Sequence, residues 1–263
     1  MSSKNKNAIV TIMTGVDPSY AYALKSFKHY GQKVGADVIV LHREAKSFKG
    51  LRCFDFSKKA WAQKFLLPKF LQDYERVLYL DADIVVHPHA PDLFATYSDP
   101  QKIYMFNEGR IEDRAQEWDL IHQLNGAREA FYYNAGVILF SRESRFLLEV
   151  EEKAVEFFLQ RSKYYEQTYF NFYIAKHKLA HQSIDEKFNR MIISGAKEKR
   201  FEAFFIHHAG GAYSNRSKFR FLTLIEDYCL LYQHKLSWKE KGQIFFSALG
   251  FYLRRQLKKK FAS

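Results

Sequence analysis

The sequence predicts an α/β fold, with a mostly parallel sheet that carries helices on both faces. Short apolar runs rich in β-branched residues alternate with segments of helical periodicity. The runs are apolar throughout instead of alternating with polar residues, as strands buried on both faces are. The 263 residues are 47% hydrophobic and 17% aromatic, so the chain can bury a large core.

The chain begins with a strand, a helix and a second strand. Residues 8–13 are apolar and β-branched and predict the first strand. Apolar and aromatic residues within 20–27 then lie on one helical face, and Gly31 or Gly35 ends that helix. Residues 37–41 predict the second strand, which completes the first strand–helix–strand unit.

The next unit leads to the third strand. Trp61 and Phe65 lie on one face of a predicted helix that Ser57 caps and Pro68 bends. Residues 77–80 are wholly apolar and predict the third strand.

Further elements follow in the second half of the chain. Strands are predicted at 104–106, 137–140 and 203–206, and helices at 143–159 and 166–176.

Two carboxylates, Asp81 and Asp83, follow the third strand directly. Ligands of parallel α/β sheets bind beyond the carboxyl ends of the strands. Residues i and i+2 of an extended chain point to the same side, so we expect both side chains to reach one ion. Carboxylate oxygens are ligands that Mg²⁺ and Mn²⁺ prefer. The alternative is that one Asp starts a turn and the other caps a neighbouring segment.

The same residues fit a second kind of enzyme. Residues 81–85 match the D-x-D-x-[T/V] motif of haloacid-dehalogenase-type phosphatases, in which Asp81 would attack phosphorus. That motif usually follows the first strand, and the later acidic motif of those enzymes is absent after residue 84. Both differences argue against this alternative.

The charge of the chain indicates an anionic partner. The formal net charge is +12, which suits nucleic acid, anionic lipid or a phosphorylated substrate. We expect no nucleic acid, because no helix-turn-helix or RNA-binding pattern is present. Cys53 and Cys229 have no metal-ligand spacing and read as thiols of a reducing compartment. With no apolar segment long enough for a signal peptide or a membrane span, we expect a cytoplasmic protein.

Residues 236–263 differ from the rest and predict a basic amphipathic extension of a catalytic domain at 1–235. Apolar residues recur every four positions, and basic residues stand between them. Such a helix binds anionic lipid, so we expect peripheral attachment to the inner face of a membrane. The alternative is a helix packed on the domain with a solvated basic face. The apolar positions are Leu249, Leu253, Leu257 and Phe261, and the basic ones Arg254, Arg255, Lys258, Lys259 and Lys260.

Several motifs, taken in order, resemble those of GT-A fold glycosyltransferases, above all the retaining glycosyltransferase family 8. This family includes glycogenin and bacterial lipopolysaccharide galactosyl- and glucosyltransferases. The resemblance spans residues 8–215. The motifs are Val77-Leu78-Tyr79-Leu80-Asp81-Ala82-Asp83, Tyr133-Asn134-Ala135-Gly136-Val137, Glu166-Gln167 with Asn171, Phe188-Asn189, and Ile206-His207-His208-Ala209-Gly210.

The resemblance implies a role for each matching residue. The metal, Mn²⁺ or Mg²⁺, would be held by Asp81, Asp83 and His207, with His208 as the alternative to His207. Gln167 would lie near the anomeric carbon and Glu166 would bind donor hydroxyls, so both are candidate catalytic residues. The residues implied in binding the nucleotide-sugar are Thr14, Gly15, Tyr20, Lys64, Asp81, Asn134, Ala135, Gly136 and Gly210.

The implied function is a metal-dependent, retaining transfer of a hexose from a UDP-sugar to a saccharide or lipid-linked acceptor. Three positions depart from the family pattern. Glu166 and Thr168 stand where the family has aspartates, and Tyr213 stands where it has a basic residue. Arg216 or Lys218 is a candidate to replace that missing charge. Because of these departures, a non-catalytic sugar-nucleotide or glycolipid-binding protein is the alternative hypothesis.

Overall fold

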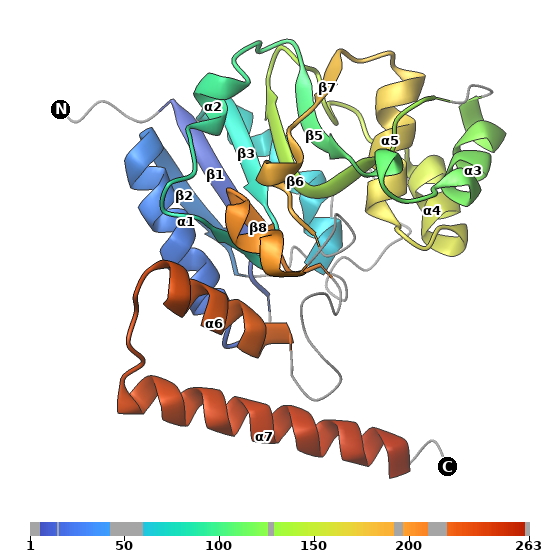
Figure 1. The fold of residues 1–263 in the computed structure, drawn as a ribbon. Coiled ribbons are helices and arrows are strands. Elements are labelled where there is room, and N and C mark those ends of the chain that lie inside the picture. Colours follow the sequence, from blue (N-terminus) through green and yellow to red (C-terminus); the bar gives the residue numbers. More distant parts are fainter. Residues whose placement is uncertain are drawn as a thin grey trace.

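The computed structural model describes residues 6–14, 16–42, 60–125, 129–191, 197–209 and 220–260 (Figure 1). A six-stranded sheet in the order β2-β1-β3-β6-β5-β7 forms its centre, and a separate two-stranded sheet pairs β4 with β8. The described part of the chain is thus α/β, with a mostly parallel central sheet as predicted.

The first three strands are parallel. β1 (Asn7–Ile12) lies between β2 (Ala36–Leu41) and β3 (Arg76–Leu80). The first predicted helix is α1 (Tyr20–Val34), and it ends at Gly35, whose φ of 63° is a left-handed conformation that glycine adopts without strain.

The segment before β3 differs from its prediction. It forms a 3₁₀ helix, η2 (Ala60–Gln72), where we expected an α-helix bent at Pro68. Pro68 has no N–H to donate, so one hydrogen bond is missing at this position in a 3₁₀ helix as it would be in an α-helix. Ser57, the predicted cap, lies outside the described residues.

One strand of the central sheet runs against the others. β6 (Tyr133–Ser141) is antiparallel to both β3 and β5 (Ile103–Asn107), while β7 (His181–Ser183) is parallel to β5. β6 also begins earlier than the predicted 137–140. The Asn-Ala-Gly motif therefore lies inside a buried strand.

The small sheet brings distant residues together. β4 (Ile84–Val86) starts one residue after Asp83 and pairs antiparallel with β8 (Phe205–His207), placing Ile84 opposite His207. β8 starts at residue 205, two residues after the predicted start at 203. Its final residue is the histidine of the candidate site.

The predicted helix at 143–159 is wrong in its first half. Helix α4 (Glu152–Arg161) starts nine residues later than expected. Arg145 and Leu147 both have φ of 56°, which interrupts a right-handed helix, and the Ser144 hydroxyl donates to the Ser141 carbonyl at 2.8 Å. Helix α5 (Glu166–Lys176) has the predicted bounds.

The remaining elements complete the layers. α3 (Ala115–Asn125) lies beside α4 and α5 at one end of the sheet (Figure 1), and α6 (Arg220–Leu231) packs on α1 and β4. The short elements are α2 (Leu93–Thr96), η3 (Glu108–Arg110), η4 (Glu186–Phe188) and η6 (Lys197–Glu202).

Two apolar layers enclose the central sheet. Ile9 and Leu78 pack on the side of α1 and α6, while their chain neighbours Val10 and Tyr79 pack on the side of η2 and α5. Successive strand residues point to opposite faces, and both faces are buried. This explains why the strands read as continuous apolar runs.

Helix α7 (Trp238–Lys260) lies beside α1 and α6 (Figure 1). The Glu240 carboxylate holds its start, accepting hydrogen bonds from Tyr22 Oη at 3.3 Å and Lys25 Nζ at 3.2 Å. Ile244 and Ala248 pack on the apolar layer of α1 and α6. No helix among the described residues is long and apolar enough to cross a membrane.

Candidate active site

The two aspartates lie in a turn, not in the extended segment that we predicted. Ile84 N donates to Asp81 O at 3.2 Å, which closes the turn between β3 and β4. Asp81 N donates to Gly136 O at 2.8 Å and His208 N to Asp83 O at 2.9 Å, so neighbouring strands fix both ends. The two carboxylates still lie close together, and β8 brings a third side chain to face them.

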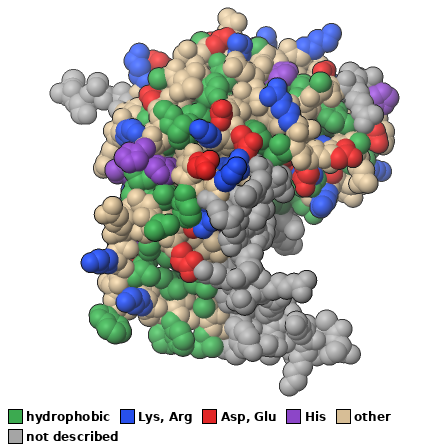
Figure 2. All heavy atoms as spheres, viewed as in Figure 1, with side chains coloured by type: hydrophobic (Ala, Val, Ile, Leu, Met, Phe, Trp, Pro, Cys, Tyr) green, Lys and Arg blue, Asp and Glu red, His purple; other side chains and the backbone are tan. Residues whose placement is uncertain are grey.

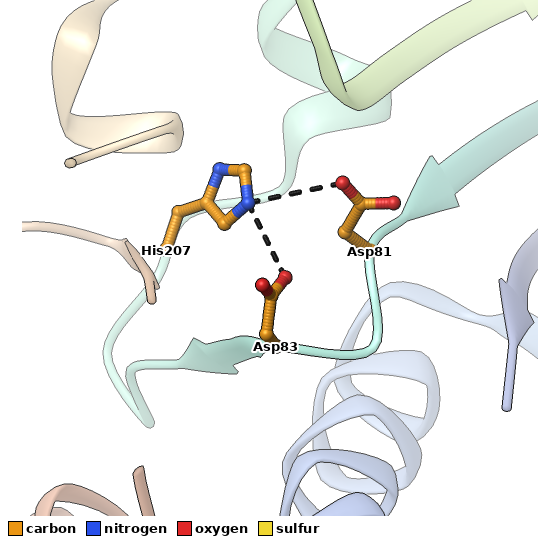
Figure 3. Close-up of side chains that lie close together, drawn as sticks. All are labelled: Asp81, Asp83 and His207. Carbon is orange, nitrogen blue, oxygen red and sulfur yellow. Dashed lines mark ion pairs between the residues drawn. The ribbon is translucent and has the colours of Figure 1, made fainter. Parts of the chain in front are cut away.

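That third side chain is His207. Its Nε2 lies 3.3 Å from Asp83 Oδ1 and 3.8 Å from Asp81 Oδ2 (Figure 3). One ligand atom from each of the three residues lies within 4.8 Å of the others. His208 points elsewhere, with its Nε2 3.3 Å from Asp227 Oδ2. Of the two histidines weighed from the sequence, the structure places His207 with the aspartates.

A chain of hydrogen bonds fixes the tautomer of His207. Gly136 N donates to Asn134 Oδ1 at 2.9 Å, which identifies that atom as the amide oxygen. Asn189 Nδ2 donates to the same oxygen at 2.9 Å, so Asn189 Oδ1 is an acceptor 2.7 Å from His207 Nδ1. Neutral His207 therefore carries its proton on Nδ1, and its Nε2 lone pair faces the two carboxylates.

The surroundings of Asp83 suit a metal ligand. Its Oδ1 is buried and has no hydrogen-bond partner among the described residues, whereas Oδ2 accepts from Arg220 Nη1 at 2.8 Å. Burial by itself would raise the pKa of Asp83, but His207, while it is protonated, and the Arg220 guanidinium more than offset this effect and hold the pKa well below its usual range. An ionised oxygen that faces an imidazole lone pair fits a divalent cation between them.

Lys64 joins three groups of the site. Its Nζ lies 3.1 Å from Asp81 Oδ1, 3.0 Å from Glu166 Oε1 and 3.1 Å from Ala135 O. Burial would lower the pKa of Lys64, yet the two carboxylates raise it above its ordinary value. The three N–H groups of the ammonium are thus all used, and Lys64 holds Asp81 and Glu166 in place.

Gln167 and Asn134 form the wall next to Lys64. Gln167 Oε1 accepts from Ala135 N at 3.0 Å and from Asn134 Nδ2 at 3.2 Å, and Asn134 Nδ2 also donates to Glu108 Oε2 at 2.7 Å. A Cβ added at Gly136 would lie only 2.3 Å from His207 Cε1. Glycine is therefore the residue that allows the imidazole to approach β6 so closely.

The other residues of the Glu166-Gln167 motif support the fold. Asn171 accepts from Tyr133 N at 2.6 Å and donates to Tyr133 O at 2.9 Å, which fixes the start of β6. Thr168, which replaces an aspartate of the family pattern, is fully buried and hydrogen-bonded to Glu117 and Tyr132. It lies in a buried polar network and does not line the site cavity.

One cavity of about 770 Å³ is lined by Lys64, Asp81, Asp83, Asn134, Glu166, Gln167 and His207. Acidic and basic side chains gather together on this face of the molecule (Figure 2). Tyr20 lies at the cavity and donates from its hydroxyl to Thr14 O at 3.3 Å. Gly15 and Gly210, and the alternative cations Arg216 and Lys218, lie outside the described residues.

Sequence reasoning missed several residues of the cavity. Glu108 directly follows β5, and the carboxylate-after-strand signal that singled out Asp81 applies to it equally. Arg220 had no comparable signal, because it is one of many basic residues in the chain. Trp61 and Tyr165 also line the cavity, with their rings stacked at 5.2 Å between centroids.

The fold and the site together define a glycosyltransferase of the GT-A type. Among solved structures, the chain is similar to the galactosyltransferase LgtC in complex with donor and acceptor sugar analogs. The identity is 15% and the TM-score 0.59, covering 89% of this chain and 99% of that one. It is also similar to mouse xyloside xylosyltransferase 1 in its apo form, at 14% identity and a TM-score of 0.51, covering 80% of this chain and 100% of that one.

A third similar structure is a glycosyltransferase involved in the glycosylation of the major capsid of PBCV-1. The identity is 16% and the TM-score 0.50, with 82% of this chain and 98% of that one covered. Such low identities show the fold alone. The family model for glycosyl transferase family 8 matches residues 8–212, so the chain belongs to this family. Comparison with curated proteins finds no match.

Proposed function

We propose that the protein transfers a hexose from a UDP-sugar to a saccharide or lipid-linked acceptor, with metal dependence and retention of configuration. The observation that supports this best is the convergence of Asp81, Asp83 and His207 at the cavity, where one Asp83 oxygen has no hydrogen-bond partner in the part of the chain that the structure describes. Family membership supports sugar transfer and argues against the phosphatase alternative.

Asp81, Asp83 and His207 would hold Mn²⁺ or Mg²⁺. Such an ion, when bound, neutralises the negative charge that develops on the departing diphosphate. The protein itself prepares the three ligands. Lys64 orients Asp81, Arg220 orients Asp83, and Asn189 keeps the proton of His207 on the nitrogen that faces away from the carboxylates.

The residues beside the ligands would bind the donor. In this proposal Glu166 accepts hydrogen bonds from sugar hydroxyls and Gln167 lies next to the anomeric carbon. The hydrogen bonds of Gln167 to β6 hold its amide in one orientation, so it needs no rearrangement as charge develops on the sugar. The remaining donor contacts that we propose are Thr14, Gly15, Tyr20, Asn134, Ala135, Gly136 and Gly210.

Release of UDP from UDP-sugars with and without Mn²⁺ tests this function. We expect Mn²⁺-dependent release by the wild type and a loss of at least about 100-fold in Asp83→Ala, because a metal ligand is removed. Asp73→Ala, which removes an exposed carboxylate outside the cavity, is the matched control. Equal release by the wild type and Asp83→Ala would favour the non-catalytic binding protein instead.

We also propose that the protein is cytoplasmic and attaches to the inner face of an anionic membrane through α7. Trp238 is 89% exposed, Phe245 63% and Phe246 70%. Figure 2 shows hydrophobic side chains at the lower edge of the molecule, where Figure 1 places the start of α7. A membrane would cover such aromatic residues and attract the basic residues that follow them in the sequence.

Co-sedimentation with vesicles tests the attachment. We expect binding to vesicles that contain phosphatidylglycerol and little binding to pure phosphatidylcholine. The double variant Phe245→Ser, Phe246→Ser should lose most of it. Leu148→Ser changes an exposed leucine outside α7 and should bind as the wild type does. Equal binding of both variants would refute attachment through α7.

A further inference from the structure

Arg220 is the first residue of α6, and its side chain lies at the cavity that contains the aspartates. Its Nη1 donates to Asp83 Oδ2 at 2.8 Å. The side chain is 37% exposed, whereas that of Lys64 is 6% exposed. Arg220 therefore contacts Asp83 and remains partly exposed at the cavity.

The other cations at the cavity have different environments. Lys64 uses its three N–H groups on Asp81, Glu166 and the Ala135 carbonyl. Arg114 forms ion pairs with Glu108 and Glu112 and donates from Nη1 to Tyr164 Oη at 2.7 Å.

Lys163 is exposed, and its Nζ lies 5.4 Å from the centre of the Tyr164 ring, on the α5 side of the cavity. Among the described residues that line the cavity, Arg220 is the cation that contacts Asp83.

The two oxygens of Asp83 have separate tasks. Oδ1 faces His207 and has no hydrogen-bond partner among the residues that the structure describes, while Oδ2 accepts from Arg220. A cation held by Oδ1 would leave the contact between Oδ2 and Arg220 intact. The Asp83 carboxylate would then lie between the cation and the guanidinium of Arg220. Four of the five guanidinium N–H groups are not used by the bond to Asp83.

We propose that Arg220 binds the diphosphate of the sugar donor, beside the cation held by Asp83. The inference rests on the function proposed above. A planar guanidinium matches the spacing of phosphate oxygens and forms charge-assisted hydrogen bonds with them. In the transfer step the diphosphate takes the electron pair of the broken bond to the anomeric carbon. The acceptor hydroxyl oxygen bonds to that carbon, and its proton passes to the departing phosphate.

The charge of the cavity explains why such a cation is needed. Its described lining holds five carboxylates and four cationic side chains. An anionic diphosphate would therefore enter a site of net negative charge unless a divalent cation is bound. Removing Arg220 would take away one of the four positive charges and expose the phosphate to Asp83 directly. We thus expect diphosphate binding to require both the divalent cation and Arg220.

Calorimetric titration with inorganic pyrophosphate and with UDP, each at saturating Mn²⁺, tests the proposal. Arg220→Gln should lower both affinities about 10- to 100-fold, the range for losing hydrogen bonds to a charged group. Arg220→Lys should keep part of each affinity, because it retains the charge. Arg161→Gln changes an exposed arginine on α4 and should match the wild type. Melting curves establish that each variant is folded.

Titration with Mn²⁺ alone separates phosphate binding from a purely positioning role. If Arg220 binds phosphate, Arg220→Gln should lower the pyrophosphate affinity more than the Mn²⁺ affinity, because Asp83 loses one orienting partner while all three metal ligands remain. A Mn²⁺ affinity that falls as far as the pyrophosphate affinity would overturn the proposal and leave Arg220 as a support for Asp83. Unchanged pyrophosphate affinity in Arg220→Gln, or no pyrophosphate binding by the wild type, would overturn it as well.

The same data distinguish this inference from the proposed function. If pyrophosphate binding depends on Arg220 but UDP binds no better than ADP, the uridine donor is wrong and the role of Arg220 holds. If UDP release depends on Mn²⁺ and Asp83 while Arg220→Gln binds pyrophosphate normally, the proposed function holds and the role of Arg220 is wrong.

Discussion

Nδ1 of His207 lies 2.7 Å from Oδ1 of Asn189, and this contact decides which nitrogen of the imidazole faces the two aspartates. Asn189 in turn donates to Asn134, whose oxygen also accepts from the backbone of β6. Strand β6 therefore determines, through Asn134 and Asn189, which nitrogen of His207 carries the proton. A ligating histidine oriented in this way is a more basic and better-placed ligand.

Asn189→Leu should lower the affinity for Mn²⁺ about 10- to 100-fold, because the imidazole loses the acceptor that fixes its tautomer. Metal titration of the folded variant measures the effect. Asn189→Asp keeps an acceptor for His207 and should retain more affinity than the leucine variant. Wild-type affinity in a folded Asn189→Leu protein would show that the contact has no influence on the metal site.

Gly136→Ala should displace His207, because the new methyl group would lie 2.3 Å from Cε1 and 2.9 Å from Nδ1 of the ring. We expect a loss of about 1–3 kcal/mol in the free energy of unfolding from overpacking, and at least about a tenfold loss of Mn²⁺ affinity. Urea denaturation and metal titration provide the two values.

Gly242→Ala is the matched control for that substitution. A Cβ at Gly242 would meet open space, and the residue lies within helix α7. Alanine there should raise stability by about 0.5–1 kcal/mol and leave metal binding unchanged. If both alanine variants bind Mn²⁺ equally well, the close approach of His207 to β6 is not required.

Lys64→Met should destabilise the protein by about 3 kcal/mol, because Asp81 and Glu166 lose their shared cation in a largely buried site. Thermal melting with and without Mn²⁺ measures this. The ion should raise the melting temperature of the variant more than that of the wild type, since it replaces part of the missing charge. Lys69→Met, on the exposed side of the same helix, should change stability by less than about 0.5 kcal/mol. Equal stability of both variants would contradict the bridging role of Lys64.

Asp227→Asn should lower stability near neutral pH by about 3 kcal/mol and remove one component of acid denaturation. Arg200 holds the Asp227 carboxylate with two hydrogen bonds of 2.8 and 2.9 Å, and His208 lies beside it. Burial would raise the pKa of Asp227, but these partners lower it below the ordinary value of 3.8. A carboxyl with a depressed pKa stabilises the folded state above its unfolded pKa, and this is lost as the pH falls through the folded pKa.

The difference in unfolding free energy between the wild type and Asp227→Asn should therefore be constant above about pH 5 and shrink below pH 4. Denaturation at a series of pH values gives this difference. Glu226→Gln changes the exposed neighbouring carboxylate and serves as the control. A difference that grows on acidification would show that the sign is wrong.

Local patterns predicted much of the fold. The bounds of α5 agree with the prediction, and those of β1, β2 and β3 agree to within one residue, because apolar runs and helical faces are properties of short segments. The helix predicted from 143 was wrong, since side-chain hydrogen bonds at Ser141 and Ser144 stabilise turns that periodicity does not report.

The chemistry of the site was only partly predictable. Asp81, Asp83 and His207 were recognised as a set from their motifs, and the structure brings them together. The family resemblance implies a basic residue near the metal-binding aspartates at Lys64, and the contact of Lys64 with Asp81 agrees with it. The contacts of Lys64 with Glu166 and Ala135, and that of Arg220 with Asp83, were not predictable. Each joins residues far apart in the chain, and no local pattern encodes which partner a long basic side chain will meet.

The sequence by itself determined the class of fold, the strand that ends in two carboxylates and the residue types available for chemistry, because these depend on local periodicity and composition. Only the tertiary structure decided that β6 runs antiparallel between β3 and β5, that β4 pairs with β8, and hence which side chains meet. The physical reason is that folding minimises the free energy of the whole chain at once. Strand pairing and the compensation of buried charges both depend on residues that lie far apart in the sequence. The position of the proton on His207 and the approach of its ring to Asp83 result from that global packing.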